Sequence, residues 1–364
     1  MLKMGSMKKT PGLTPLLFED KPIFGLDIGN STVRVMQLNA SKKKCKVIGY
    51  GEVSFDPTAL VDGVIVKHEL IAEAINKLFT HNLIGDITTK RVALSLPIGR
   101  AFTRSIDLPK MQDKELTEAV KTEVEQYIPA AADDLYVDYS VLPRNNNKTT
   151  VFIVAMPRKI VDSHMRLMRM LGLETVLVET TSSSGAKLFG RDSQSDLPAV
   201  LIDFGSTSAD ITIFDKGPTV SGTVACGGEE ITQLIANALN VSDREAVIIK
   251  TKYGLALSKK QKQIETALEP PLNLLVREIR RTIRYYEERT KSKRSISQVV
   301  IMGGGANMPG LTDYMTNALR IPVRSFDPTI YLDFGRLQPI NIGDRMSYVT
   351  AAGLSLNQAQ EVFK

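Results

Sequence analysis

The feature that most constrains the fold is a sequence pattern that occurs twice, about half the chain length apart. Residues 25–32 read Gly-Leu-Asp-Ile-Gly-Asn-Ser-Thr, and residues 201–208 read Leu-Ile-Asp-Phe-Gly-Ser-Thr-Ser. In both, an apolar stretch carries an aspartate, and a glycine and three small polar residues follow. Alternating strand sequences follow at 32–38 and 209–214. Such an internal repeat predicts two similar lobes that each open with the same β-hairpin.

The residue types in the two turns are suited to binding phosphate. A P-loop or dinucleotide site has a helix after its glycine loop, whereas β-branched residues follow here, so each turn is expected to close a hairpin. Gly29 and Gly205 allow the backbone to approach a ligand, and consecutive N–H groups in such a turn can bind an anion. The small polar residues that follow add donors: Asn30, Ser31, Thr32, Ser206, Thr207 and Ser208. Two facing hairpins are therefore expected to hold one polyphosphate.

An aspartate precedes each turn glycine by two residues. Asp27 and Asp203 would repel a polyphosphate unless a cation lay between them. Magnesium keeps much of its hydration shell, so both carboxylates are expected to bind Mg²⁺ through its water ligands.

Composition excludes several other classes of protein. The 364 residues exceed one ordinary core, and 43% hydrophobic with 24% charged residues is a globular balance. Two cysteines are too few for a disulfide framework or a structural zinc site. His68, His81 and His164 lack metal-ligand spacing, and no stretch approaches the roughly 20 apolar residues of a membrane span. The net charge of +6 is compatible with a phosphate ligand.

Hydrophobic periodicity predicts alternating strands and helices. Strands are expected at 23–28, 32–38, 47–55, 91–96, 136–142, 149–156, 174–178, 199–203, 209–214, 219–225 and 299–302. Helices are expected at 70–79, 116–128, 160–171, 182–188, 231–239, 243–253, 272–291 and 311–319. The last long helix carries five arginines, Arg277, Arg280, Arg281, Arg284 and Arg289. Because no aromatic residues suited to base stacking are interleaved there, we interpret them as a solvated face and expect no nucleic-acid partner.

Together these motifs resemble the actin/Hsp70/sugar-kinase ATPase superfamily. Residues 25–34 resemble its phosphate-1 hairpin, 201–214 its phosphate-2 hairpin, 179–181 its connecting segment and 301–311 its adenosine motif. The resemblance covers about residues 23–356. It implies an α/β actin-like ATPase fold, with two lobes of mixed sheet and helices, that binds ATP and Mg²⁺.

The resemblance also implies roles for further residues. Arg34 matches the basic phosphate contact, Glu179 the residue that orients the attacking water, and Asp203 the second-lobe carboxylate, so Glu179 and Asp203 are the expected catalytic pair. The expected nucleotide contacts further along the chain are Gly227 and Gly228 before a helix, Lys250 near the ribose and adenine, and Gly303, Gly304 and Gly305 at the nucleoside. Val247 departs from the pattern, because relatives carry a ribose-binding glutamate there.

Within the superfamily, several segments resemble the PilM family of type IV pilus assembly proteins: residues 25–38, 125–129, 137–142 and 274–286. This resemblance implies a cytoplasmic scaffold at the inner face of the membrane, attached through the N-terminal cytoplasmic peptide of a PilN-like membrane protein. The implied division is a flexible tail (1–21), a first lobe 1A (22–101 and 163–198), an inserted subdomain 1C (102–162) and a second lobe 2A/2B (199–364). Subdomain 1C is a candidate surface for self-association.

Two alternatives of the same fold remain open. A sugar kinase would need a sugar pocket with a catalytic aspartate, for which the sequence offers no candidate. An FtsA-like division filament protein usually ends in an amphipathic membrane-targeting helix, whereas this sequence stops at Gln358–Lys364 soon after the last fold motif. Whether ATP is hydrolysed or only bound is also left open.

Overall fold

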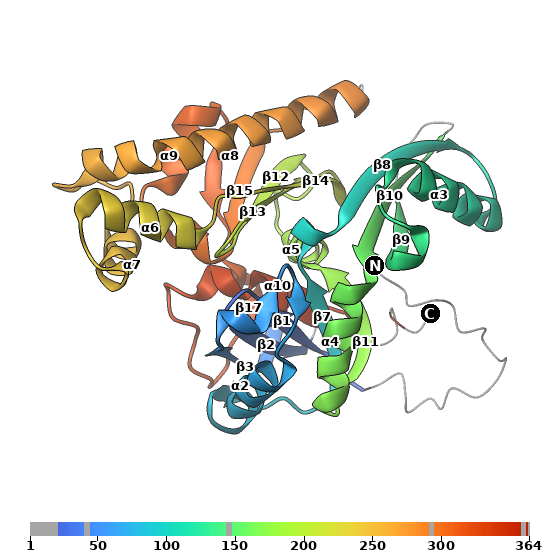
Figure 1. The fold of residues 1–364 in the computed structure, drawn as a ribbon, viewed down its shortest axis with the longest axis horizontal. Coiled ribbons are helices and arrows are strands. Elements are labelled where there is room, and N and C mark those ends of the chain that lie inside the picture. Colours follow the sequence, from blue (N-terminus) through green and yellow to red (C-terminus); the bar gives the residue numbers. More distant parts are fainter. Residues whose placement is uncertain (1–20, 40–43, 143–147, 291–294, 358–361, 363–364) are drawn as a thin grey trace. The chain divides into compact units, whose positions relative to one another are not determined.

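The computed structural model describes residues 21–39, 44–142, 148–290, 295–357 and 362, and the chain divides into two units (Figure 1). Unit 1 comprises residues 1–188, 329–339 and 350–364, and unit 2 comprises 189–328 and 340–349. The expected flexible tail, except its last residue, lies outside the described residues.

Unit 1 is built on a mixed seven-stranded sheet. Its strands are β1 (Phe24–Ile28), β2 (Thr32–Asn39), β3 (Cys45–Ser54), β6 (Leu83–Gly85), β7 (Arg91–Leu96), β11 (Glu174–Thr180) and β17 (Leu332–Asp333). The order is β11-β7-β1-β2-β3-β17, and β6 also pairs with β3. β1 is antiparallel to β2 and parallel to β7, so the first hairpin lies at the centre of the sheet.

Helices cover both faces of this sheet. On one face α2 (His68–His81) and α4 (Arg158–Met170) pack against Phe24, Leu26 and Ile28 of β1 (Figure 1). On the other face lie α5 (Thr181–Phe189) and α10 (Val349–Ser355). A Cβ atom on Gly25 would overlap the Ala351 carbonyl oxygen, and one on Gly353 would overlap that of Ser184. Glycine at these positions therefore lets β1, α10 and α5 approach one another closely.

Residues 102–157 form a small separate layer within unit 1. Strands β8 (Phe102–Pro109), β10 (Lys148–Pro157) and β9 (Leu135–Leu142) pair antiparallel in that order, and α3 (Asp113–Tyr127) packs on them. The core joins Leu116, Val120 and Val124 of α3 to Ile106, Val151 and Ile153 of the sheet. The predicted hairpin of β9 and β10 is confirmed, whereas β8 was not predicted. A short hairpin of β4 (Leu60–Val61) and β5 (Val64–Ile65) completes unit 1.

Unit 2 has a five-stranded sheet in the order β14-β13-β12-β15-β16. The strands are β12 (Ala199–Phe204), β13 (Ala209–Phe214), β14 (Pro218–Val224), β15 (Gln298–Met302) and β16 (Val323–Ser325). Its helices are α6 (Gly228–Leu239), α7 (Asp243–Lys252), α8 (Gln261–Thr290) and α9 (Leu311–Leu319). One apolar core includes Ile202 and Ile211 of the sheet and Ile235, Ile279 and Met315 of the helices.

Helix α8 corrects one expectation. The prediction began this helix at Leu272, whereas the helix begins at Gln261 and runs through Pro270 and Pro271. Interior proline costs about 3 kcal/mol of helix stability. Here Ile264 and Leu268 continue the apolar stripe upstream and are fully buried, so core packing overrides the local signal.

The C-terminal residues also depart from the expected division, which put all of 199–364 in the second lobe. Residues 329–339 and 350–364 belong to unit 1. The reason lies in pairing: β17 adds to β3, and the Ser355 hydroxyl donates to the Met36 carbonyl oxygen at 2.6 Å.

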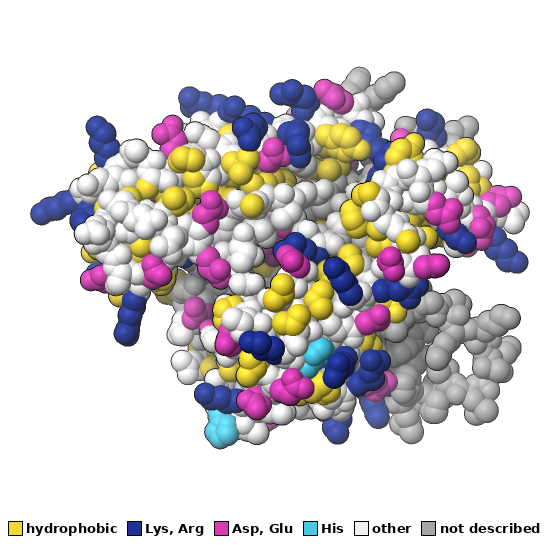
Figure 2. All heavy atoms as spheres, viewed as in Figure 1, with side chains coloured by type: hydrophobic (Ala, Val, Ile, Leu, Met, Phe, Trp, Pro, Cys, Tyr) yellow, Lys and Arg dark blue, Asp and Glu magenta, His cyan; other side chains and the backbone are white. Residues whose placement is uncertain are grey.

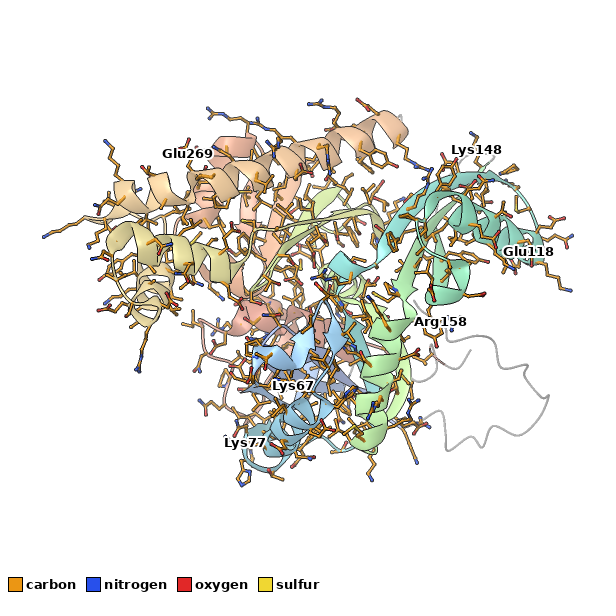
Figure 3. All side chains as sticks on the ribbon, viewed as in Figure 1. Lys67, Lys77, Glu118, Lys148, Arg158 and Glu269 are labelled. Carbon is orange, nitrogen blue, oxygen red and sulfur yellow. The ribbon has the colours of Figure 1, made fainter. Side chains whose placement is uncertain are left out.

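Charged side chains of both signs are interspersed on the face shown in Figure 2. Lys77, Glu118 and Glu269 project into solvent (Figure 3). Along α8, Arg281 pairs with Glu278 at 2.6 Å and Arg280 donates to the Ala318 carbonyl oxygen. The arginines of this helix are thus partly engaged within the chain.

Candidate functional site

The sequence repeat is a structural repeat. In the first hairpin Asp27 pairs with Arg34, and the Gly29 N–H donates to the Thr32 carbonyl oxygen at 2.8 Å. In the second hairpin Asp203 pairs with Asp210, and the Gly205 N–H donates to the Ser208 carbonyl oxygen at 2.9 Å. Both predicted hairpins are confirmed, with the same turn hydrogen bond.

Asp27 is buried at the centre of unit 1. The Ser95 hydroxyl of β7 donates to its Oδ1 at 2.6 Å. Burial raises the pKa of Asp27, and the Ser95 hydrogen bond and the charge of Arg34 oppose that rise. The strand that carries Ser95 was predicted from the sequence, but Ser95 was not identified as a partner of this carboxylate.

Arg34 already has protein partners beside the first turn. Its Nε lies 3.0 Å from Glu52 Oε2 on β3, and its Nη1 donates to the Thr32 hydroxyl. The Ser31 carbonyl oxygen accepts from Phe55 N–H at 2.9 Å. The cation is therefore oriented at the turn by an acidic neighbour.

Glu179 lies on the same face of the sheet as Asp27. Residues in register on adjacent strands project to the same face, and Ser95 pairs with Glu179 while its neighbour Leu94 pairs with Leu26. Glu179 is buried, its Oε1 lies 2.6 Å from Lys187 Nζ, and Ser184 Oγ donates to its Oε2 at 3.3 Å. Lys187 and Ser184 both belong to α5.

In unit 2 the second turn packs against the start of α6. Gly228 N–H donates to the Gly205 carbonyl oxygen at 3.0 Å, and Glu229 N–H donates to that of Ser206 at 2.8 Å. A Cβ atom on Gly227 would overlap Ser206. The predicted glycines 227 and 228 thus lie directly beside the predicted phosphate turn 205–208.

Lys250 also joins this group. From α7, its Nζ donates to the Gly228 carbonyl oxygen at 2.8 Å and to the Thr232 hydroxyl at 2.7 Å. Burial lowers the pKa of Lys250, and Glu229 opposes that shift. Val247, one turn earlier on α7, is 44% exposed, so an apolar side chain stands where the sequence pattern called for a ribose acceptor.

The glycine loop after β15 closes against Asp203. Gly303 has φ of 84°, and a Cβ atom there would overlap Asp203 Oδ1. A Cβ atom on Gly305 would overlap the Phe204 ring. The loop 303–305 therefore adjoins the second hairpin.

Asp210 is the acidic residue that sequence reasoning missed. It faces Asp203 across β12 and β13, and Thr223 Oγ1 donates to its Oδ1 at 2.7 Å. Burial raises the pKa of Asp210 to about 6. The signal was available in the repeat, because Asp210 holds the place of Arg34.

A cavity of about 340 Å³ adjoins the glycine loop within unit 2. Its lining includes Asn307, Met308, Asp327, Arg345 and Met346. Arg345 Nη1 lies 3.2 Å from Asp327 Oδ2, so the cavity combines an ion pair with apolar methionines. Residues 345–346 were not predicted, because they come from a distant segment.

The carboxylates fit a hydrated magnesium ion. In the described ranges, no group of three or more acidic, histidine or cysteine residues could hold a metal ion by itself. One or two carboxylates per unit suit Mg²⁺, which keeps several waters and binds substrate phosphates. The site residues predicted from the sequence lie in two groups, one around Asp27 in unit 1 and one around Asp203 in unit 2.

Comparisons with known proteins agree with this architecture. A family model described as "Type IV pilus assembly protein PilM" matches residues 25–359. The cell division protein FtsA of Bacillus subtilis (strain 168) is 24% identical over 349 residues, covering 83% of this chain and 78% of FtsA. A solved "PilM-PilN type IV pilus biogenesis complex" superposes with TM-score 0.77 at 22% identity, covering 92% of this chain and 98% of that chain. MreB 5 of Spiroplasma citri bound to AMPPNP gives TM-score 0.53 at 13% identity, covering 92% and 95%.

The two hairpin sheets, the glycine loop and these structural neighbours define an actin-like ATPase fold. Within that class the family model covers most of the sequence. The chain belongs to the PilM family of type IV pilus assembly proteins. No helix within the described part of the chain has the length and apolar character needed to cross a bilayer.

Proposed function

We propose that this chain binds ATP with Mg²⁺ through its two hairpin turns and acts as a nucleotide-dependent scaffold of type IV pilus assembly. The carrying observation is the pair of hairpins with the same turn hydrogen bond at Gly29 and Gly205. Each turn offers backbone N–H groups and small hydroxyls to phosphate oxygens. The aspartate beside each turn, Asp27 or Asp203, would bind the Mg²⁺ ion that accompanies the phosphates.

Each chain segment has a distinct task in this mechanism. The turns at 29–32 and 205–208 would hold the β- and γ-phosphates, with Arg34 as the cationic contact. The loop 303–305 would bring the backbone against the nucleoside, and Lys250 would lie on its sugar side. Asp27, Asp203 and Asp210 would hold Mg²⁺, which neutralises charge on the phosphates when bound.

Bound nucleotide would act by shifting the chain between two conformational states. ATP would favour the state in which it contacts both hairpins. The shift can be no larger than the difference between its affinities for the two states. The scaffold would thus present different surfaces with and without nucleotide.

The partner in this proposal is the N-terminal cytoplasmic peptide of a PilN-like membrane protein. The similarity to a solved PilM-PilN complex supports it. The chain would then work at the cytoplasmic face of the inner membrane, held there through the partner.

Binding of a fluorescent ATP analogue with and without Mg²⁺ tests the nucleotide site. Asp203→Asn should abolish most of the Mg²⁺ dependence while analogue binding without Mg²⁺ changes little. Asp243→Asn, an exposed carboxylate on α7, is the matched control. An Mg²⁺ dependence equal to that of the unaltered protein would contradict the metal assignment.

Pull-down with a PilN-like peptide, with and without ATP and Mg²⁺, tests the partner. Retention should depend on nucleotide. If the peptide fails to bind in either condition while ATP binds, the docking proposal is wrong and the nucleotide site stands.

A further inference from the structure

Glu179 is held in an ion pair that the proposed mechanism does not need. Its Oε1 lies 2.6 Å from Lys187 Nζ, and its Oε2 accepts from Ser184 Oγ. The Glu179 side chain is 3% exposed, whereas that of Lys187 is 32% exposed. The carboxylate expected to orient water is thus buried and bonded at both oxygens.

The ammonium of Lys187 is itself anchored. It donates to Asn357 Oδ1, just beyond α10. Asn357 is buried, and its Nδ2 donates to the Leu354 carbonyl oxygen at 2.8 Å. A chain of contacts therefore runs from Glu179 through Lys187 to the end of α10.

A buried carboxylate in such an ion pair cannot easily form a hydrogen bond with the attacking water. To orient water, an oxygen of Glu179 would have to be reached by solvent, whereas the side chain is 3% exposed and is held by two donors from α5. Moving Lys187 away would leave the buried Glu179 carboxylate without its charged partner, which is unfavourable. The pair thus favours the arrangement in which Glu179 does not meet water.

We propose that Lys187 is a positioning residue that withholds Glu179 from the attacking water, so that bound ATP is retained rather than hydrolysed. Asn357 is its anchor, which places control of hydrolysis at the end of α10. This inference rests on the proposed nucleotide site.

The suppressed step is ordinary hydrolysis of ATP. The water oxygen forms a bond to the γ-phosphorus, and the bond from that phosphorus to the β–γ bridging oxygen breaks. ADP leaves with the electron pair of that bond, and the proton lost by water passes to Glu179 and then to solvent. Water is the only co-reactant.

The test is single-turnover phosphate release, measured beside ATP·Mg²⁺ affinity on the full chain. Lys187→Met should raise the rate roughly a hundredfold or more, in the range of one positioned general base, with affinity within about twofold. Lys187→Arg keeps the cation and should stay near the starting rate. Adding Glu179→Gln to Lys187→Met should remove the gain, which a purely structural role for Lys187 would not predict.

An unchanged rate in Lys187→Met, with folding and affinity intact, would overturn the inference. If Lys187→Met does not fold, Asn357→Ala decides: it removes only the anchor and should raise the rate severalfold, and no increase overturns the inference. Absence of nucleotide binding in the unaltered protein would instead contradict the proposed function.

Discussion

Asp210 of the second hairpin stands where Arg34 stands in the first. Each faces the repeat aspartate directly across its strand pair. The first hairpin thus pairs opposite charges, and the second pairs like charges, which destabilise a sheet when they lie directly opposite. A bound cation would relieve that repulsion, which is why the second hairpin is the stronger candidate for holding Mg²⁺.

This arrangement predicts how stability varies with pH. Burial raises the pKa of Asp210 from 3.8 to about 6, so the folded state binds the proton more tightly than the unfolded state does. The stability from the protonated group is present below about pH 4 and lost as pH rises through 6. Asp210→Asn should therefore stabilise the nucleotide-free protein at pH 7.5, by up to about 3 kcal/mol, and have little effect near pH 4.

Urea unfolding of the nucleotide-free protein at both pH values measures this difference. Glu288→Gln, an exposed carboxylate on α8, is the control and should show no such pH dependence. A stabilisation that is equal at both pH values would show that burial of the Asp210 carboxylate is not its cause.

The glycine loop gives a second prediction. Gly303→Ala places a methyl group against Asp203 at a positive φ, so it should destabilise the protein by about 1–3 kcal/mol and weaken ATP binding. Gly222→Ala on β14 is the matched control, because a Cβ atom there meets nothing within 4 Å. Thermal unfolding and ATP affinity are the measurements, and equal effects of the two substitutions would contradict the loop's assignment.

The sequence predicted the residues of this site that lie within continuous motifs. Gly29, Gly205 and Gly303 each lie in a turn that a run of glycine and other small residues marks in the sequence. Ser95 and Lys187 were missed, because they reach the site through strand and helix packing that local spacing does not encode. Asp210 could be predicted from the repeat, because it lies seven residues after Asp203 as Arg34 lies seven residues after Asp27.

In the fold, too, the elements determined by local sequence were predicted, and those determined by tertiary packing were missed. Helix α9 was predicted with both ends correct, since its apolar spacing and flanking residues agree. The start of α8 was missed because burial of Ile264 and Leu268 outweighs two prolines. Strand β17, two residues long, exists through its pairing with β3, and no periodicity can signal so short a strand.

Arg34 should distinguish ATP from ADP. As a contact to the β- and γ-phosphates, its loss in Arg34→Gln should weaken ATP binding by about 1.5–3 kcal/mol, and ADP binding less. Arg100→Gln breaks an exposed ion pair with Asp62 in the same unit and serves as control. Calorimetry with both nucleotides measures the two losses; equal losses would mean that Arg34 acts only through its ion pair with Glu52.

The edge of the inserted subdomain should govern self-association. β9 lies at the edge of its three-stranded sheet, and Val141 on it is 56% exposed. Val141→Lys puts a charge on this edge and should lower any self-association measured by sedimentation velocity. Val61→Lys, a 51% exposed valine elsewhere in unit 1, should not. Equal behaviour of the two variants would exclude the β9 edge as the interface.

The most direct measurement is a crystal structure of the full chain with a non-hydrolysable ATP analogue and Mg²⁺. We predict one triphosphate that accepts hydrogen bonds from both turns, 29–32 and 205–208, with the ion beside Asp27 and Asp203. A triphosphate bound to one turn alone, with the other turn's aspartate facing a separate surface, would contradict this prediction.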